Sequence, residues 1–187
     1  MLLGASDRIL QGSIKHHLIV SINRTQFLRG DLCGAQSSIR PPWAKPEVEF
    51  VEKCERCDDC ISECPQHIIQ RGPGGFPRID FSQGGCTFCG DCVKACTHKV
   101  LAFFNDLNQP PWPLKAEIAD NCLSMQGVVC RSCGEVCDES AIRFKLEVGG
   151  KARPLLNSED CTGCGECFAV CPSQSVTLKP QQQDQAA

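Results

Sequence analysis

The sequence predicts an α+β protein built from two tandem copies of one small module, in which short helices and short β-hairpins surround blocks of cysteine. Three observations predict this. Of the 187 residues 17 are cysteine, and sixteen of these fall in four blocks between Cys54 and Cys171. Each half of this region contains a block, a hairpin pattern, a second block and a strand pattern in the same order, which indicates an internal duplication. A proline-rich segment lies between the halves.

The four blocks have the spacing of a 4Fe–4S binding run. The first, second and fourth read C-x2-C-x2-C-x3-C, and the third differs only in its first gap, which is seven residues long. This run binds 4Fe–4S clusters in bacterial ferredoxins, because a tight loop can present three thiolates to three iron corners of a cubane. The candidate ligands are Cys54, Cys57, Cys60, Cys64, Cys86, Cys89, Cys92, Cys96, Cys122, Cys130, Cys133, Cys137, Cys161, Cys164, Cys167 and Cys171.

The fourth cysteine of each block is expected to serve the other block's cluster, as in two-cluster ferredoxins. We therefore expect tandem two-cluster, ferredoxin-like modules with four 4Fe–4S clusters, or three if the stretched third motif is empty. A three-iron cluster at that motif is a further alternative. The predicted ligand sets are set one (Cys54, Cys57, Cys60, Cys96), set two (Cys64, Cys86, Cys89, Cys92), set three (Cys122, Cys130, Cys133, Cys171) and set four (Cys137, Cys161, Cys164, Cys167).

Zinc and disulfides are the alternatives to iron. A zinc ribbon uses two C-x2-C pairs at one tetrahedral ion, whereas this repeated spacing leaves a cysteine over. Disulfides require an oxidising compartment and an export signal, and the N-terminal region has neither a signal-peptide pattern nor a complete twin-arginine motif, since Thr25 replaces one arginine. No apolar run reaches the ~20 residues of a membrane span. We therefore expect a cytoplasmic protein with metal-bound cysteines.

Glycine and proline positions and the alternation of apolar and charged side chains predict the domain organisation. Residues 142–148 alternate apolar and charged side chains before Gly149-Gly150, which predicts a hairpin with residues 152–156. A second hairpin is expected around the glycine-rich turn at 72–75, short closing strands at 99–104 and 175–179, and a short helix at 165–170. The predicted parts are a flexible basic arm (1–46), a first module (47–107), a linker (108–113), a second module (114–180) and a disordered tail (181–187).

Charge and motifs exclude other classes of function. The formal net charge is −3, and four oxidised clusters with their thiolates would add about −8. A body this acidic argues against nucleic acid as a partner. The chain has no Ser/His/Asp set, phosphate loop or paired-carboxylate site, so we do not expect an enzyme.

The motifs together resemble one family. RPPWA at Arg40, CxRCxxCxxxCPxxIIxRGxGGFPxxDF, CTFCGxCxxAC, the stretched third block and CxGCGxCxxxCP are similar to NapF, the ferredoxin-type accessory proteins of the periplasmic nitrate reductase system. The resemblance covers residues 40–177, and residues 1–20 lie outside it. It implies a cytoplasmic protein with several 4Fe–4S clusters that interacts with the catalytic subunit of periplasmic nitrate reductase before export. It further implies that the protein assists maturation of that subunit, through assembly of the subunit's own cluster.

Two other functions stay open at this stage. An electron-transfer polyferredoxin for a cytoplasmic or membrane redox enzyme would have the same cofactors, because fold and cofactor do not determine the partner. A zinc-structured interaction module would yield a colourless protein without acid-labile sulfide. Iron and sulfide contents per chain distinguish the second possibility from the first.

Overall fold

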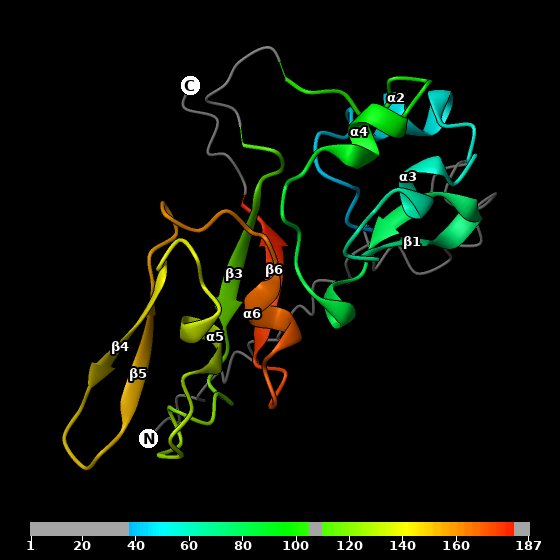
Figure 1. Cartoon of the computed structure of the whole chain (residues 1–187). Helices are drawn as coiled ribbons and strands as arrows, with labels where there is room; N and C mark the ends of the chain where they lie inside the picture. Colours follow the sequence, from blue (N-terminus) through cyan, green and yellow to red (C-terminus); the bar gives the residue numbers. More distant parts are fainter. Residues whose placement is uncertain (1–37, 105–109, 182–187) are drawn as a thin grey trace, which may run out of the picture. The chain divides into compact units, whose positions relative to one another are not determined.

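The computed structural model describes residues 38–104 and 110–181 (Figure 1). The predicted tail from residue 182 and most of the predicted arm therefore lie outside the described residues. The mixture of short helices and short strands matches the α+β expectation. The elements in chain order are α2 (Glu47–Lys53), α3 (Asp59–Ser62), β1 (Ile69–Arg71), η1 (Pro73–Gly75), β2 (Pro77–Ile79), η2 (Phe81–Gln83), α4 (Asp91–Ala95), β3 (Leu114–Ile118), α5 (Ser132–Glu135), β4 (Ile142–Leu146), β5 (Ala152–Leu156), α6 (Glu166–Ala169) and β6 (Val176–Pro180).

The described strands form three two-stranded antiparallel sheets. The two predicted hairpins are confirmed: β1 pairs with β2 over three residues, and β4 pairs with β5 over five. The third sheet joins β6, which was expected, to β3, which was not, with Ile118 opposite Val176. Strand β3 therefore connects the start of the second half to its end.

The prediction of a strand at 99–104 is wrong, because only Leu101 of this segment forms a β-bridge, and its partner is Ala44. Two further backbone bonds flank this bridge, from Lys45 N–H to the Val100 carbonyl and from Ala102 N–H to the Trp43 carbonyl. Prolines at 41, 42 and 46 surround the partner segment and have no N–H to donate to a longer ladder. The contact occupies the place in the first half that the β3–β6 sheet occupies in the second.

Residues 38–46, which the predicted arm included, pack against the first half of the chain. Pro41 and Pro42 are almost fully buried. The Arg40 guanidinium bonds both carboxylate oxygens of Glu47 at 2.7 and 2.9 Å and donates to the Pro77 carbonyl at 3.0 Å. It also lies over the ring of Phe50, 4.9 Å from the ring centroid. Arg40 thus joins this segment to α2 and to the first hairpin.

The backbone after the last cysteine of each block has the same turn in all four blocks. The third residue beyond that cysteine has a positive φ and donates its N–H to the cysteine carbonyl, at 2.8 to 3.2 Å. The residues are His67, Lys99, Ser140 and Gln174. Proline follows only the first and last of these cysteines, so the turn does not depend on proline.

Two groups of buried side chains form the core. The first includes Phe50, Ile68 and Leu101, and the second includes Ile142 and Val176. Partly buried Phe168 and Leu178 pack against both groups. The two halves therefore share apolar contacts.

The segment predicted as a linker contains a buried anchor. Trp112 is 6% exposed, and its ring meets Phe81 and Phe88 edge-on at 5.8 and 5.5 Å between centroids. Its indole N–H donates to the Thr162 carbonyl at 3.1 Å. Trp112 thus contacts residues of both halves.

Candidate iron–sulfur centres

The fold gathers the sixteen cysteines of the blocks into the four predicted sets. In each set, burial raises the pKa of one thiol, and that thiol also lies close enough to the other three for their negative charges to raise its pKa further. Cys60 is influenced in this way by Cys54, Cys57 and Cys96, although Cys64 is nearer to Cys60 in sequence than Cys96 is. The corresponding thiols are Cys86 in set two, Cys133 in set three and Cys167 in set four.

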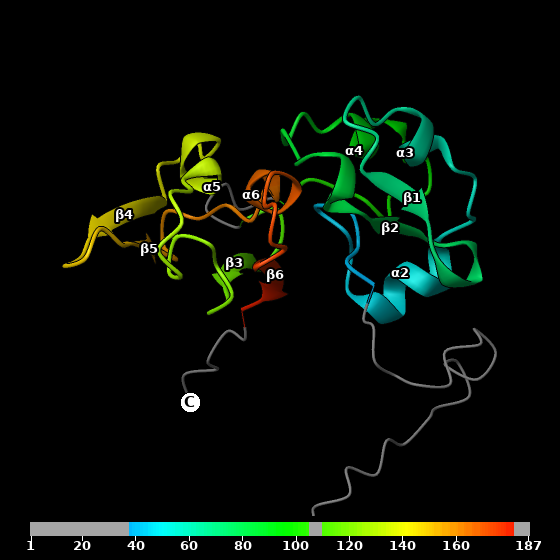
Figure 2. The ribbon, with the colours of Figure 1, turned by 90° about the horizontal axis from the view of Figure 1, so that it is seen from below.

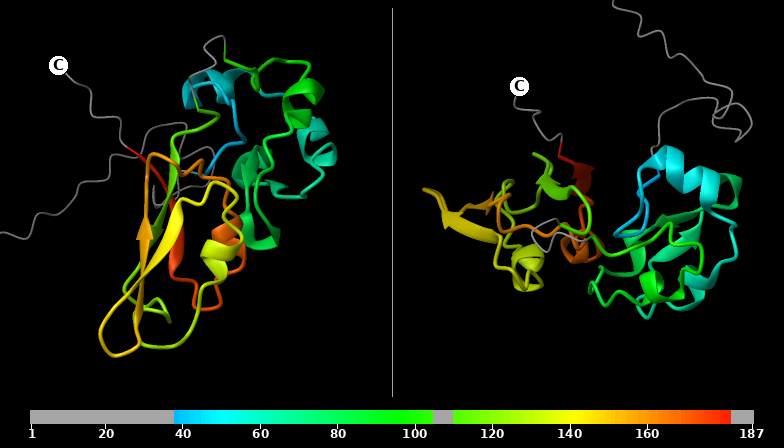
Figure 3. Two further views of the ribbon diagram at one scale, coloured as in Figure 1. Left: turned by 60° about the vertical axis from the view of Figure 1, so that its left-hand side comes forward. Right: turned by 90° about the horizontal axis from the view of Figure 1, so that it is seen from above.

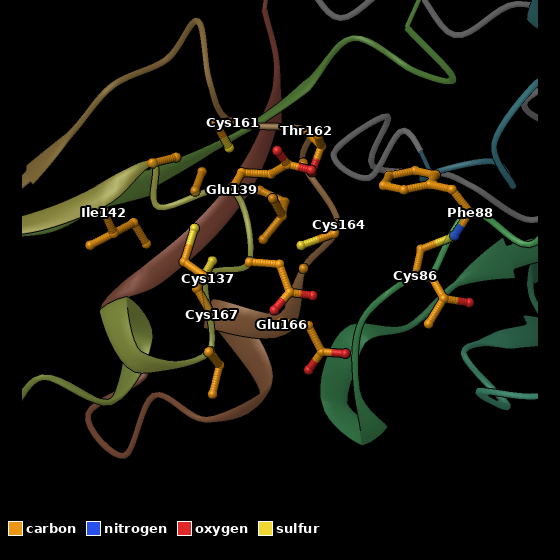
Figure 4. Close-up of a pocket in the computed structure, with 18 residues that line it drawn as sticks. Cys86, Phe88, Cys137, Glu139, Ile142, Cys161, Thr162, Cys164, Glu166 and Cys167 are labelled. Atoms are coloured by element: carbon orange, nitrogen blue, oxygen red, sulfur yellow. The ribbon is translucent and has the colours of Figure 1, made fainter.

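Three sets surround a cavity with all four of their cysteines. Those of set one and set two each line a small cavity. Set four lines a cavity of about 220 Å³, and Figure 4 shows Cys137, Cys161, Cys164 and Cys167 among the residues that surround it. Among the described residues, no three His, Cys, Asp or Glu side chains converge closely enough to hold one metal ion. Four soft thiolate donors distributed around a volume fit a multi-iron cluster.

Left-handed residues curl the loop that carries the first three cysteines of a block. In block two, Phe88 and Gly90 have φ of 54° and 78°, and the Phe88 N–H donates to the Cys86 Sγ at 3.4 Å. Blocks one and four have left-handed residues at the same two places, Arg56 and Asp58 in one, Gly163 and Gly165 in the other. A short helix (α3, α4 or α6) follows, and the fourth cysteine comes just after it.

The third block reaches the same sulfur grouping by a different backbone. Arg131, after its second cysteine, has φ of −137° and is not left-handed. The seven residues of the gap fold into successive tight turns, including bonds from Met125 N–H to the Cys122 carbonyl and from Val128 N–H to the Leu123 carbonyl, both 3.0 Å. These turns leave Cys122 buried at 7% exposure and near Cys133. The long gap therefore does not remove Cys122 from set three.

Burial raises the pKa of seven of these thiols. It raises the pKa of Cys60, Cys86 and Cys167 to about 12 and of Cys92 and Cys133 to about 11, and nearby thiolates add to the increase. Such thiols keep their protons at neutral pH unless a positive charge replaces them, as bound iron would. The sites therefore favour a cationic occupant.

The pKa of Cys171 is shifted in the opposite direction. Burial would raise its pKa, but hydrogen bonds from Ser175 and Ser173 outweigh burial and lower the pKa to about 7. The Ser175 N–H lies 3.3 Å from the Cys171 Sγ, and the Ser175 hydroxyl lies 3.4 Å from it. Sequence reasoning missed both serines. Their signal is a Ser-x-Ser pair that follows the fourth cysteine in the last block alone.

Neighbouring sets lie next to each other within each half. The charge of Cys92 in set two raises the pKa of Cys60 in set one, and Cys133 in set three acts on Cys167 in set four in the same way. Each of these is the third cysteine of its block. The helices that carry them pack in pairs, α3 with α4 and α5 with α6 (Figure 2).

Sets two and four also meet through the backbone. Cys86 N–H donates to the Cys164 carbonyl at 2.7 Å, and Gly85 N–H donates to the Glu166 carboxylate at 3.1 Å. A Cβ on Gly85 would stand 2.7 Å from the Glu166 nitrogen, and one on Gly165 would stand 2.1 Å from the Phe81 ring. Glycine therefore permits this close approach.

Fold and site together define a ferredoxin-type protein with two dicluster domains. Residues 53–101 and 128–175 each match a family described as 4Fe-4S dicluster domain. Cys122 lies outside the second match, whereas Cys130 lies inside it. No helix in the described part of the chain is long and apolar enough to span a membrane.

The chain belongs to the NapF family of ferredoxin-type proteins. It is 39% identical to the ferredoxin-type protein NapF of Escherichia coli K12 over 160 residues, which are 86% of this chain and 96% of the relative. It is also 39% identical to NapF of Haemophilus influenzae, over 89% of this chain and 99% of the relative. A methylamine utilization ferredoxin-type protein, MauM of Methylophilus methylotrophus, is 32% identical over 78% of this chain and 71% of its own length.

Proposed function

We propose that this protein is a cytoplasmic 4Fe–4S polyferredoxin that interacts with the catalytic subunit of periplasmic nitrate reductase. In this function it assists maturation of that subunit, through assembly of the subunit's cluster, before export. The observation that carries the proposal is the grouping of sixteen cysteines into four sets in a chain of the NapF family. The precursor form of the subunit is the expected partner.

We assign one 4Fe–4S cluster to each of sets one to four, with the sixteen block cysteines as ligands. When bound, such clusters accept and donate single electrons. The protein's own residues bury the sulfurs and curl the ligand loops, and in set three Ser175 donates a hydrogen bond to the Cys171 Sγ. Hydrogen bonds to cluster sulfurs help to set the reduction potential.

Iron and sulfide per chain, measured after anaerobic purification, test the cofactor assignment. About sixteen iron atoms and as many sulfides support four clusters, and about twelve of each support three. A colourless preparation that contains zinc and lacks acid-labile sulfide would overturn the assignment.

A pull-down from nitrate-respiring cells tests the partner. We expect this chain to recover the catalytic-subunit precursor and to recover much less of the exported form. The cluster content of the catalytic subunit, compared between cells with and without this protein, tests the maturation step. Equal cluster content in the two strains contradicts that step even if the pull-down succeeds.

The second candidate function is electron carriage for a cytoplasmic or membrane redox enzyme. It is favoured by the Cys86–Cys164 backbone bond, which holds two sulfur sets side by side, and by the similarity to MauM, a protein named for methylamine utilization. Rapid, reversible transfer of electrons to an acceptor, together with normal nitrate reductase maturation in its absence, would support this function over the first.

A further inference from the structure

The β4–β5 hairpin carries a basic face that cluster binding does not require. Side chains at Arg143, Lys145, Arg153 and Leu155 point to one face, because Arg143 is opposite Leu155 and Lys145 is opposite Arg153 in the antiparallel register. All four are exposed. The other face is apolar, and near the base of the hairpin Phe144 packs closely on α5 at Gly134.

The arrangement of charges on this face lowers the stability of the hairpin. Like charges directly opposite each other in a sheet are destabilising, and Lys145 and Arg153 are such a pair. Glu147 is the one acidic residue of the hairpin, and it bonds Arg153 at 2.9 Å. Lys145 has no ion-pair partner within the described residues. An arrangement that weakens the free hairpin is explained if an anionic partner covers it.

Exposed apolar side chains lie on both faces of the hairpin and at its tip. Leu146 is 69% exposed, Leu155 is 47% exposed, and Val148 at the tip is fully exposed. The corresponding hairpin in the first half is short, and its Ile69 and Ile79 are buried. The β4–β5 hairpin instead extends past α5 (Figures 1 and 3). Its outer end therefore contributes little to the core.

The rest of the described chain has the opposite charge balance. Arg143, Lys145, Lys151 and Arg153 give the hairpin four basic residues against one acidic residue, whereas acidic residues outnumber basic ones elsewhere in residues 38–104 and 110–181. An extended polyanion, such as nucleic acid or an anionic membrane, would also face these acidic regions. A short acidic segment would contact the hairpin alone.

We propose that the basic face of the β4–β5 hairpin is a docking surface for an acidic polypeptide segment of a partner protein. Arg143, Lys145 and Arg153 would bind its carboxylates, and Leu155 would contact an apolar side chain between them. In the described chain β4 and β5 pair only with each other, so the outer edge of β4 can also accept an added strand. The edge of β5 is less suited to this, because the Ala152 carbonyl already accepts from Ser124 and Pro154 has no N–H. The proposal extends the proposed function by giving the docking surface and the chemistry of its partner.

A binding measurement on the anaerobically purified holoprotein tests this surface. The probe is a fluorescein-labelled synthetic peptide rich in glutamate and aspartate with a central leucine, and the reference is its lysine counterpart. We expect fluorescence anisotropy to show salt-sensitive binding of the acidic peptide alone. The triple variant Arg143→Gln/Lys145→Gln/Arg153→Gln should bind it about tenfold more weakly.

A matched control removes the same charge elsewhere. Lys53→Gln/Lys94→Gln/Lys99→Gln lowers the net charge equally in the first half, and all three lysines are exposed. It should leave peptide binding within about twofold of the wild type. Equal weakening by both triple variants would show a general charge effect and overturn the proposal.

Charge reversal separates binding from folding. Lys145→Glu places a carboxylate opposite Arg153, so it should keep the hairpin folded and raise its stability slightly, while it weakens peptide binding. Unchanged iron content and circular dichroism would confirm the fold. A stable Lys145→Glu variant that binds the peptide as the wild type does would contradict the proposal.

Two further measurements distinguish a protein partner from a membrane surface. Cosedimentation with phosphatidylglycerol vesicles that depends on these three residues, without peptide binding, would overturn the proposal in favour of a membrane surface. In the nitrate reductase pull-down, loss of the subunit with the hairpin triple variant supports the proposal, and equal recovery overturns it while the proposed function stands. If the wild-type chain recovers no subunit, the proposed function fails and the peptide measurement alone decides the docking surface.

Discussion

The two halves of the chain share one arrangement of sulfurs but differ in the sheets around it. In both halves, third cysteines from two blocks lie near each other across adjacent sets. In the first half the closing contact is a single bridge between Ala44 and Leu101, whereas in the second half β3 and β6 pair over five residues. The first hairpin has three pairs, and the second has five.

The difference shows which parts of the module the cysteine spacing constrains. The loops, the short helices and the turn after each fourth cysteine recur, because they place sulfurs. Strand length varies, because only the base of a hairpin contacts the core. The stretched third block extends the same conclusion: its added residues fold on themselves and leave Cys122 close to Cys133.

Removal of the first ligand in each half should have the largest effect and would test whether the halves are equivalent. Cys54→Ala and Cys122→Ala should each reduce iron from about sixteen to about twelve atoms per chain. Iron and sulfide analysis of both variants beside the wild type is the measurement. If Cys54→Ala loses iron and Cys122→Ala does not, set three lacks a four-iron cluster and the halves differ in cofactor as well as in sheets.

Disruption of the contact between the halves should have the next largest effect. Gly165 and Gly149 have nearly the same φ, 92° and 89°, but a Cβ on Gly165 would overlap Phe81, and one on Gly149 would meet nothing within 4 Å. Gly149→Ala should cost about 1–2 kcal/mol from the left-handed backbone alone. Gly165→Ala should cost a further ~1–3 kcal/mol from overpacking.

Chemical denaturation of the two glycine variants measures this difference. Electron paramagnetic resonance of the reduced protein should also show weaker magnetic interaction between clusters in Gly165→Ala alone. Equal stability of the two variants would mean that the Phe81–Gly165 contact does not hold the halves together.

Cluster uptake should depend on pH in both halves. Burial raises the pKa of Cys60 in the first half and of Cys167 in the second half to about 12, and bound iron requires thiolates, so loading displaces protons. The yield of anaerobic reconstitution should therefore rise from about pH 6 to about pH 9 and fall on acidification. Calorimetry in two buffers of different ionisation enthalpy counts the protons, and uptake without proton release would contradict the expectation.

The smallest expected effect distinguishes two buried serines of the second half. Ser175 and Ser124 are each 1% exposed, but Ser175 hydrogen-bonds the Cys171 Sγ, and Ser124 donates to the Ala152 carbonyl. Alanine at either position should cost about 1 kcal/mol of stability. Only Ser175→Ala should lower the reduction potential of one cluster, because it removes a donor to sulfur. Redox titration of both variants measures this, and equal potentials would contradict it.

The spacing of the blocks, together with the crossed ligation of two-cluster ferredoxins, predicted which sulfurs the fold brings near Cys60, Cys86, Cys133 and Cys167. That these sulfurs ligate iron stays a prediction. The β4–β5 hairpin was also predictable, since its side chains alternate with period two. Strand β3 was not, because its partner β6 lies about sixty residues away. Packing of residues 38–46 depends on contacts of Arg40 with Glu47 and Phe50, which no local pattern indicates.

The crossed arrangement of the blocks has a consequence for biogenesis. Cys96 completes the group that begins at Cys54, and Cys171 completes the one that begins at Cys122. During translation, no group in a half can therefore be complete until the second block of that half has left the ribosome. The first half can receive its iron while the second is still being synthesised. Delivery of iron to the nascent chain would then proceed in two stages, one for each half.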